Sequence, residues 1–82
     1  MHGTAHLLIL ARSYADFLGK PLSTVSSRVF DDGKKLDAIA AGADLYSGRL
    51  NRAIQWFSDN WPADLEWPSE VQRPAASLAE AS

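Results

Sequence analysis

Apolar residues recur every three or four positions through the first 61 residues of the chain, and this spacing predicts a series of helices. The first helix is expected from Ala5 to Leu18, after a frayed segment at Met1–Thr4. Its predicted apolar face consists of Leu7, Leu10, Ala11, Tyr14, Ala15, Phe17 and Leu18. Gly19 fits the position just beyond a helix, where the left-handed backbone conformation favours a residue without Cβ. Pro21 supports a stop there, because the residue before a proline is biased away from helical geometry.

Two short helices are predicted next. The second helix is expected to begin at an N-cap, Ser23, and to run to about Phe30. We expect its inner face to carry Leu22, Val25 and Val29, and its outer face to carry Ser26 and Ser27. The segment 31–33, Asp-Asp-Gly, predicts a turn. A third helix is then predicted from Lys34 to Ala41.

A longer fourth helix is predicted from a cap at Asp44 to about Asn60. Its apolar stripe is expected to contain Leu45, Leu50, Ala53, Ile54, Phe57 and Trp61. No segment alternates between apolar and polar residues for long enough to indicate a strand. The pattern therefore predicts an all-α fold, a small bundle of about four helices.

Three prolines, Pro62, Pro68 and Pro74, end the helical spacing after Trp61. Residues 62–74 are therefore predicted to form an extended arm rich in Pro and Trp, following a helical domain at 1–61. Because this arm is too apolar for a free tail, we expect it to pack over its own core or over a second copy of the chain. Residues 75–82 are expected to be a disordered tail, and no internal repeat is expected.

Composition narrows the function classes. The 82 residues predict one small domain, and the absence of cysteine excludes a disulfide framework or a thiolate zinc site. The apolar run at residues 7–10 is too short to span a bilayer and lacks the flanks of a secretory signal, so a cytoplasmic location without membrane contact is expected. The net charge of −2 arises from the carboxylates after Trp61, whereas all cations except Arg73 precede it.

The spacing of Ala15, Gly19 and Val25 resembles the helix-turn-helix motif of bacterial and phage repressors of the Cro and lactose-repressor type. In that motif a small residue lies where the two helices touch, a glycine forms the turn, and a valine six residues later fills the space between the helices. Tyr14 and Leu18 match the apolar positions of the first helix. The motif's apolar positions at Lys20 and Arg28 are not matched, and we expect Leu22 and Val29 to fill them. The resemblance covers about the first third of the chain.

The resemblance implies a transcriptional regulator that binds duplex DNA as a homodimer, with its second helix in the major groove. Residues expected to meet base edges are Ser23, Thr24, Ser26, Ser27 and Arg28. Lys20, Lys34 and Lys35 are expected to reach phosphates, which supports affinity without sequence information.

Two alternatives remain open at this point. The same residues also fit an ordinary helical hairpin with no role in DNA binding. The acidic arm, with Trp67 and Val71, also fits a protein-interaction module such as an adaptor or an antitoxin.

Other chemistries are disfavoured by the residues present. His2 and His6 have no further His or Cys to complete a metal shell, and neighbouring Asp31 and Asp32 are a poor catalytic pair. No glycine-rich phosphate loop is present. We therefore expect no enzymatic activity, no metal and no cofactor.

Overall fold

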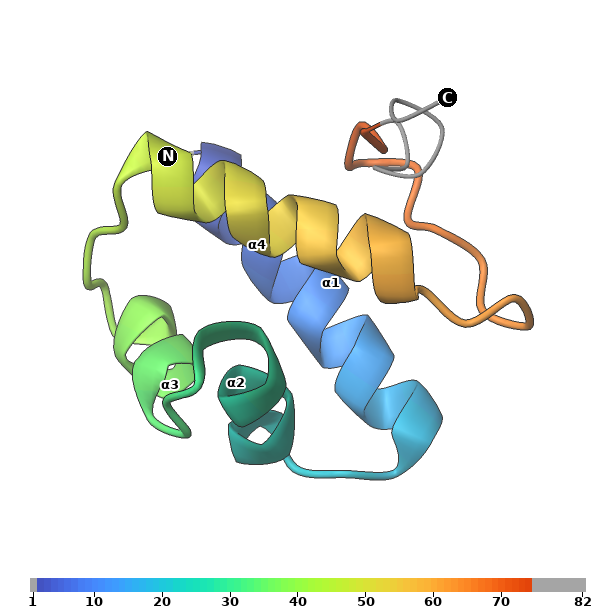
Figure 1. The fold of residues 1–82 in the computed structure, drawn as a ribbon, viewed down its shortest axis with the longest axis horizontal. Helices are drawn as coiled ribbons and strands as arrows, with labels where there is room; N and C mark the ends of the chain where they lie inside the picture. The colour runs from blue at the N-terminus through green and yellow to red at the C-terminus, as the bar shows by residue number, and fades with distance from the viewer. Residues whose placement is uncertain (1, 75–82) are drawn as a thin grey trace.

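A computed structural model of the chain describes residues 2–74, and the tail predicted at 75–82 lies outside the described residues. Within residues 2–74 four helices follow one another: α1 (His2–Leu18), α2 (Leu22–Phe30), α3 (Lys35–Ala40) and α4 (Ser47–Asn60). The long helices α1 and α4 pack against each other, and α2 and α3 pack together on one side of that pair (Figure 1). No strand occurs within residues 2–74, so the predicted all-α fold is confirmed there.

The first helix begins earlier than the sequence predicts. Helix α1 includes residues 2–4, where fraying was expected. The reason is packing against α4: a Cβ atom added to Gly3 would overlap Cδ2 of Leu50. Gly3 therefore lets the first turn of α1 approach Leu50 closely, and that contact holds the turn in place.

The turn between α1 and α2 contains the predicted glycine stop. Gly19 has a φ of 67°, in the left-handed region. Its N–H donates to the Asp16 carbonyl at 3.2 Å, and the Lys20 N–H donates to the Ala15 carbonyl at 3.0 Å. This pair of bonds is the Schellman arrangement, which satisfies carbonyls at the end of a helix.

Both predicted side-chain caps are wrong. Helix α2 begins at Leu22, so Ser23 lies inside its first turn, and the preceding residue is Pro21. The Pro21 carbonyl accepts the Thr24 N–H at 3.0 Å, and the proline's extended backbone sets the entry of the chain. Helix α4 begins at Ser47 after Tyr46, two residues later than a cap at Asp44 requires.

Helix α3 was predicted within one residue at each end. Its end repeats the arrangement at Gly19, because Gly42 has a φ of 114° and donates to the Ile39 carbonyl at 3.0 Å. The Ala43 N–H donates to the Ala38 carbonyl at 2.9 Å. The following residues, 43–46, are without regular structure and lead to α4.

The core lies where α1, α4 and the short helices meet. It is built from Leu7, Leu10, Ala11, Tyr14, Ala15, Val25, Leu36, Ile39, Ala53, Phe57, Trp61 and Val71. The ring of Tyr14 of α1 lies 5.7 Å from that of Phe57 of α4 and 6.0 Å from that of Trp61, which directly follows α4 (centroid distances). The predicted faces of α1 and α4 are confirmed except at Phe17, which is 44% exposed because it lies at the edge of the stripe.

The arm at residues 62–74 packs over the chain's own core, at the end of α4 that is distant from α3 (Figure 1). Val71 is buried, and the rings of Trp61 and Trp67 lie 4.9 Å apart in an edge-to-face contact. Arg73 closes the arm: its guanidinium lies 5.0 Å from the centre of the Trp67 ring and donates to the Ser58 carbonyl at 2.8 Å. The Ser58 hydroxyl in turn donates to the Pro74 carbonyl at 3.0 Å.

The expectation that the chain has no internal repeat is wrong, because residues 61–66 and 67–72 repeat one six-residue pattern. Each unit reads Trp-Pro, any residue, an acid, Leu or Val, and then Glu or Gln. In each unit the tryptophan Nε1–H donates to the carbonyl four residues later, at 2.8 Å from Trp61 to Leu65 and 2.7 Å from Trp67 to Val71. The aliphatic residue's N–H also donates to the proline carbonyl, at 3.1 Å in both units. The two halves of the arm are therefore the same turn used twice.

Within residues 2–74, none of the helices combines the length and apolar character needed to cross a membrane.

Candidate nucleic-acid interface

Helix α2 has one face in the core and one face in solvent. Val25 is fully buried against the core, and Leu22 and Val29 are partly buried beside it. Residues three and four positions apart share a side of a helix, so the opposite side carries Ser23 with Ser27, and Thr24 with Arg28. Ser23, Ser27 and Arg28 are exposed, and Thr24 is half-buried. We call these four residues the outer face of α2.

Ser26 does not belong to this face, and its predicted outward position is wrong. Its side chain is fully buried. The hydroxyl donates to the Asp32 carbonyl at 2.5 Å and accepts the Leu36 N–H at 3.0 Å. Ser26 therefore supplies from α2 the cap that α3 lacks, since Leu36 lies in the first turn of α3 and Lys34 precedes that helix without capping it.

The position of Ser26 could have been found in the sequence. Leu22, Val25, Ser26 and Val29 follow the spacing of one buried helix face, and Ser26 lies in the middle of it. A serine in a buried stripe needs polar partners, and here the next turn and helix provide them.

The three lysines predicted to reach phosphates flank the outer face of α2. Lys20 lies exposed in the turn before α2, and Lys34 lies exposed before α3. Lys35, at the start of α3, is half-buried. Two exposed carboxylates, Asp31 and Asp32, interrupt this positive set in the turn after α2. Asp31 has a φ of 57°, and the Asp32 carboxylate accepts the Lys34 N–H at 2.9 Å.

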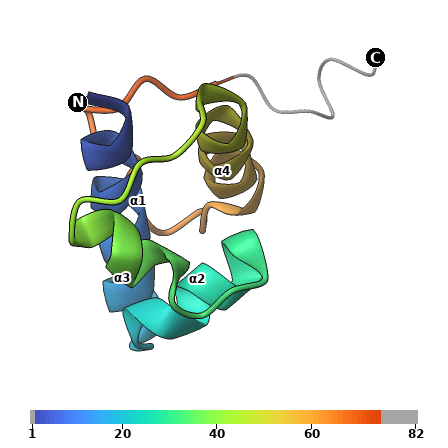
Figure 2. The ribbon, with the colours of Figure 1, turned by 90° about the vertical axis from the view of Figure 1, so that its left-hand side faces the viewer.

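The packing behind α2 agrees with the helix-turn-helix spacing. Ala15 is 7% exposed and Val25 is fully buried, and α1 and α2 are in contact across the Gly19 turn. Figure 2 shows α2 and α3 below α4 and beside α1, with the outer side of the α2–α3 pair uncovered by any other helix. The same packing would also stabilise a helical hairpin with no role in DNA binding. The outer face of α2 is therefore what distinguishes the two interpretations.

A pocket of about 470 Å³ lies near the C-terminal end of α2, lined by Lys35, Asp44, Leu45, Tyr46 and Arg49. The Arg49 guanidinium lies 5.6 Å from the centre of the ring of Phe30, the last residue of α2. Tyr46 and Arg49 are not among the site residues that the sequence predicts, because they follow α2 by more than fifteen residues. Their one sequence signal is an Arg close behind a Tyr at the start of a helix, which is too common to identify a site.

Charge is distributed unevenly between the two ends of the molecule. Residues 20–35 carry four Lys or Arg side chains and two carboxylates. Residues 59–70 carry four carboxylates and no Lys or Arg. An anionic partner would therefore be attracted to the α2 end and repelled by the arm.

Comparisons with known proteins found no matching family model, no similar curated protein and no similar solved structure. Among the described residues, no three His, Asp or Glu side chains come together as a metal site requires. The case for a function therefore rests on the outer face of α2 and its surroundings.

Proposed function

We propose that the protein is a sequence-specific, duplex DNA-binding transcriptional regulator that acts as a homodimer with α2 in the major groove. The observation that carries the proposal is the outer face of α2, where polar side chains lie exposed on a helix fixed from behind by Val25 and Ser26. Exposed hydroxyls and a guanidinium on such a face can donate to base edges, and a guanidinium such as that of Arg28 can bind guanine through two hydrogen bonds.

The homodimer follows from the size of the interface. One helix of nine residues reaches few base pairs, and motifs of this type gain affinity by binding two half-sites about one helical turn apart. Lys20, in the turn before α2, and Lys34, which follows the turn at residues 31–33, would contact phosphates beside the groove.

Selection from a pool of random duplexes tests this proposal directly. We expect enrichment of a palindromic motif, with binding that weakens as salt increases. Arg28→Ala should weaken binding to the enriched motif by about 1–3 kcal/mol and relax specificity at one position in each half-site. Arg12→Ala, which removes an exposed charge from α1, is the matched control and should change affinity little. A pool that yields no motif, together with no salt-dependent binding to any duplex, would refute DNA recognition.

The alternative role, a protein-interaction module that uses the arm, is less favoured. Its apolar anchors are engaged within the molecule, since Val71 is buried and Trp67 contacts Trp61 and Arg73. The charged side chains that the arm exposes are Asp64, Glu66, Glu70 and Arg73, so its solvent-exposed surface has net negative charge. A single stoichiometric protein partner, found together with absent DNA binding, would reverse this preference.

A further inference from the structure

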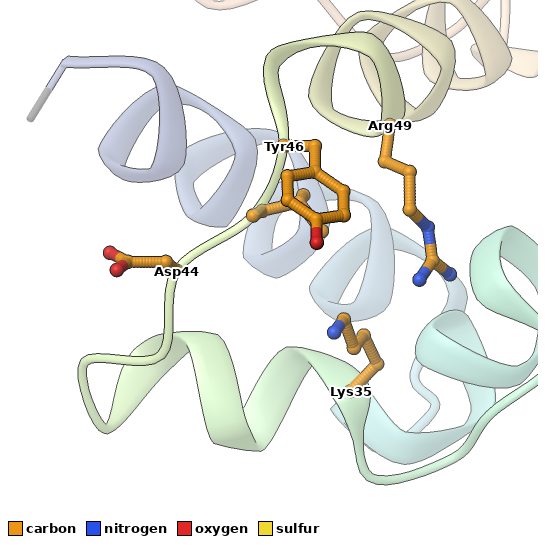
Figure 3. A pocket seen from close by; sticks show the side chains of 5 residues that line it. Lys35, Asp44, Tyr46 and Arg49 are labelled. Atoms are coloured by element: carbon orange, nitrogen blue, oxygen red, sulfur yellow. The ribbon is translucent and has the colours of Figure 1, made fainter.

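The pocket beside α2 contains a set of hydrogen-bond donors that the proposed function does not use. Lys35 comes from the start of α3, Tyr46 from the segment before α4, and Arg49 from the first turn of α4. Figure 3 shows the Tyr46 hydroxyl directed toward the space between the Lys35 ammonium and the Arg49 guanidinium. Three different segments thus bring an ammonium, a phenol and a guanidinium to one place.

The acidic residue of the pocket does not neutralise this set. The Asp44 carboxylate points away from Lys35 and Arg49 (Figure 3). No carboxylate within residues 2–74 forms an ion pair with either cation. The side of the pocket that faces Tyr46 therefore offers donors and positive charge.

Two side chains of the pocket have features that core packing does not explain. Tyr46 is 82% exposed, so its ring contributes little to the hydrophobic core. Arg49 lies over the Phe30 ring, a contact that orients a guanidinium while its edge N–H groups stay available for a ligand. The volume of about 470 Å³ lies in the range of ~300–1,000 Å³ that small-ligand sites commonly occupy.

We propose that Lys35, Tyr46 and Arg49 bind a phosphate group in this pocket. A guanidinium offers paired donors that match two phosphate oxygens, an ammonium adds a point charge, and a phenol adds a third donor. The group has two sources with the same chemistry, a backbone phosphate of duplex DNA or a free phosphate. The first source rests on the proposed function, because the pocket adjoins the end of α2; the second does not.

Inorganic phosphate is the first probe. In ¹⁵N-labelled full-length protein, we expect saturable shifts of the Arg49 side-chain Nε–H signal and of the Tyr46 signals as phosphate is added at constant ionic strength. Arg49→Gln and Lys35→Gln should each weaken this response severalfold, whereas Arg52→Gln should leave it unchanged. Arg52 is the matched control, since it is an exposed arginine of the same helix that does not line the pocket.

A 20-base-pair duplex of random sequence is the second probe, with its affinity measured over a range of salt concentrations. If a backbone phosphate occupies the pocket, Arg49→Gln should make the salt dependence shallower: the negative slope of log K for duplex binding against log salt should decrease in magnitude by about 0.9. Arg52→Gln should change this slope much less.

The two probes distinguish a failure of the phosphate-pocket proposal from a failure of the proposed DNA binding. Phosphate saturation without duplex binding supports the pocket, assigns it to a free phosphate and refutes DNA binding. Duplex binding without any phosphate response, and with equal slopes for Arg49→Gln and Arg52→Gln, overturns the pocket and leaves DNA binding standing. No response to either probe overturns both.

Discussion

The outer face of α2 and the arm differ in what their side chains do for the fold. Trp67 and Val71 of the arm face the core, as does Trp61 just before it, and the indole N–H groups of both tryptophans donate to backbone carbonyls of the arm. On α2, exposed Ser23, Ser27 and Arg28 have no core to pack against. The aromatic and aliphatic side chains of the arm therefore stabilise the core, whereas the outer face of α2 leaves its polar side chains in solvent.

This difference shows why aromatic content is a poor guide to function in this molecule. Tryptophan is common at binding surfaces because it offers a large apolar area and one donor. Here the donors and most of the rings of Trp61 and Trp67 are engaged internally, and the repeated Trp-Pro turn explains both. The residues available for recognition are small hydroxyls and cations, which attract less notice in a sequence.

Removing the Trp61 ring, next to the arm, should cause the largest loss of stability. Trp61→Ala deletes a 9% exposed side chain that contacts Tyr14, Phe57 and Trp67, and we expect a loss of about 3–5 kcal/mol in the free energy of unfolding. Urea denaturation followed by circular dichroism measures this loss. Trp61→Phe, a milder variant, keeps most of the ring contacts and remains measurable if the alanine variant does not fold.

The aromatic control for that experiment is Phe17→Ala on α1. Phe17 is 44% exposed, so its removal should cost less than about 1.5 kcal/mol. Similar losses for Trp61→Ala and Phe17→Ala would show that the arm does not contribute to the core as described.

Within α2, adjacent serines should behave differently. Ser26→Ala leaves the Asp32 carbonyl and the buried Leu36 N–H without their hydroxyl partner, and should cost about 1–3 kcal/mol of stability. Ser27→Ala changes an exposed position and should stay within about 0.5 kcal/mol of the wild type. Chemical denaturation of both variants measures the difference. Equal stability of the two variants would show that the Ser26 hydroxyl does not link α2 to the start of α3.

The regular spacing of apolar residues predicted much of this fold, whereas single polar residues did not predict the helix starts. The apolar spacing of α1 and α4 predicted most of the core, and glycine chemistry predicted the stop at Gly19. The predicted caps at Ser23 and Asp44 failed because Pro21 and Tyr46 set the two helix starts through backbone geometry. A capping residue identifies a helix start only when no such competing constraint lies nearby.

The candidate site was partly predictable for a related reason. Ser23, Thr24, Ser27 and Arg28 are consecutive or one turn apart, so local pattern was sufficient to group them. Lys35, Tyr46 and Arg49 come together only through the packing of α3 and α4, and no local pattern encodes that meeting. The polarity of Ser26 predicts an exposed side chain, whereas its position among Leu22, Val25 and Val29 places it on the buried face of α2.

The smallest predicted effect tests the charge at the end of α2. Asp31 is exposed, and it is the non-glycine residue with a positive φ in the described part of the chain. Asparagine tolerates the left-handed conformation at least as well as aspartate, so Asp31→Asn removes one negative charge while preserving the turn. Two charges about 10 Å apart in water interact by about 0.4 kcal/mol, and duplex affinity should therefore rise about twofold at low salt.

Filter binding or fluorescence anisotropy with a random-sequence duplex measures this change, with Asp64→Asn in the arm as the control. Asp64 carries the same charge and is also exposed, but it lies in the arm, at the end of α4 distant from α3. If α2 faces DNA, the gain should be confined to Asp31→Asn and should disappear as salt screens the charge. Equal gains from both variants would mean that the duplex responds to net charge alone, and the contrast between the two ends of the molecule would then carry no information about recognition.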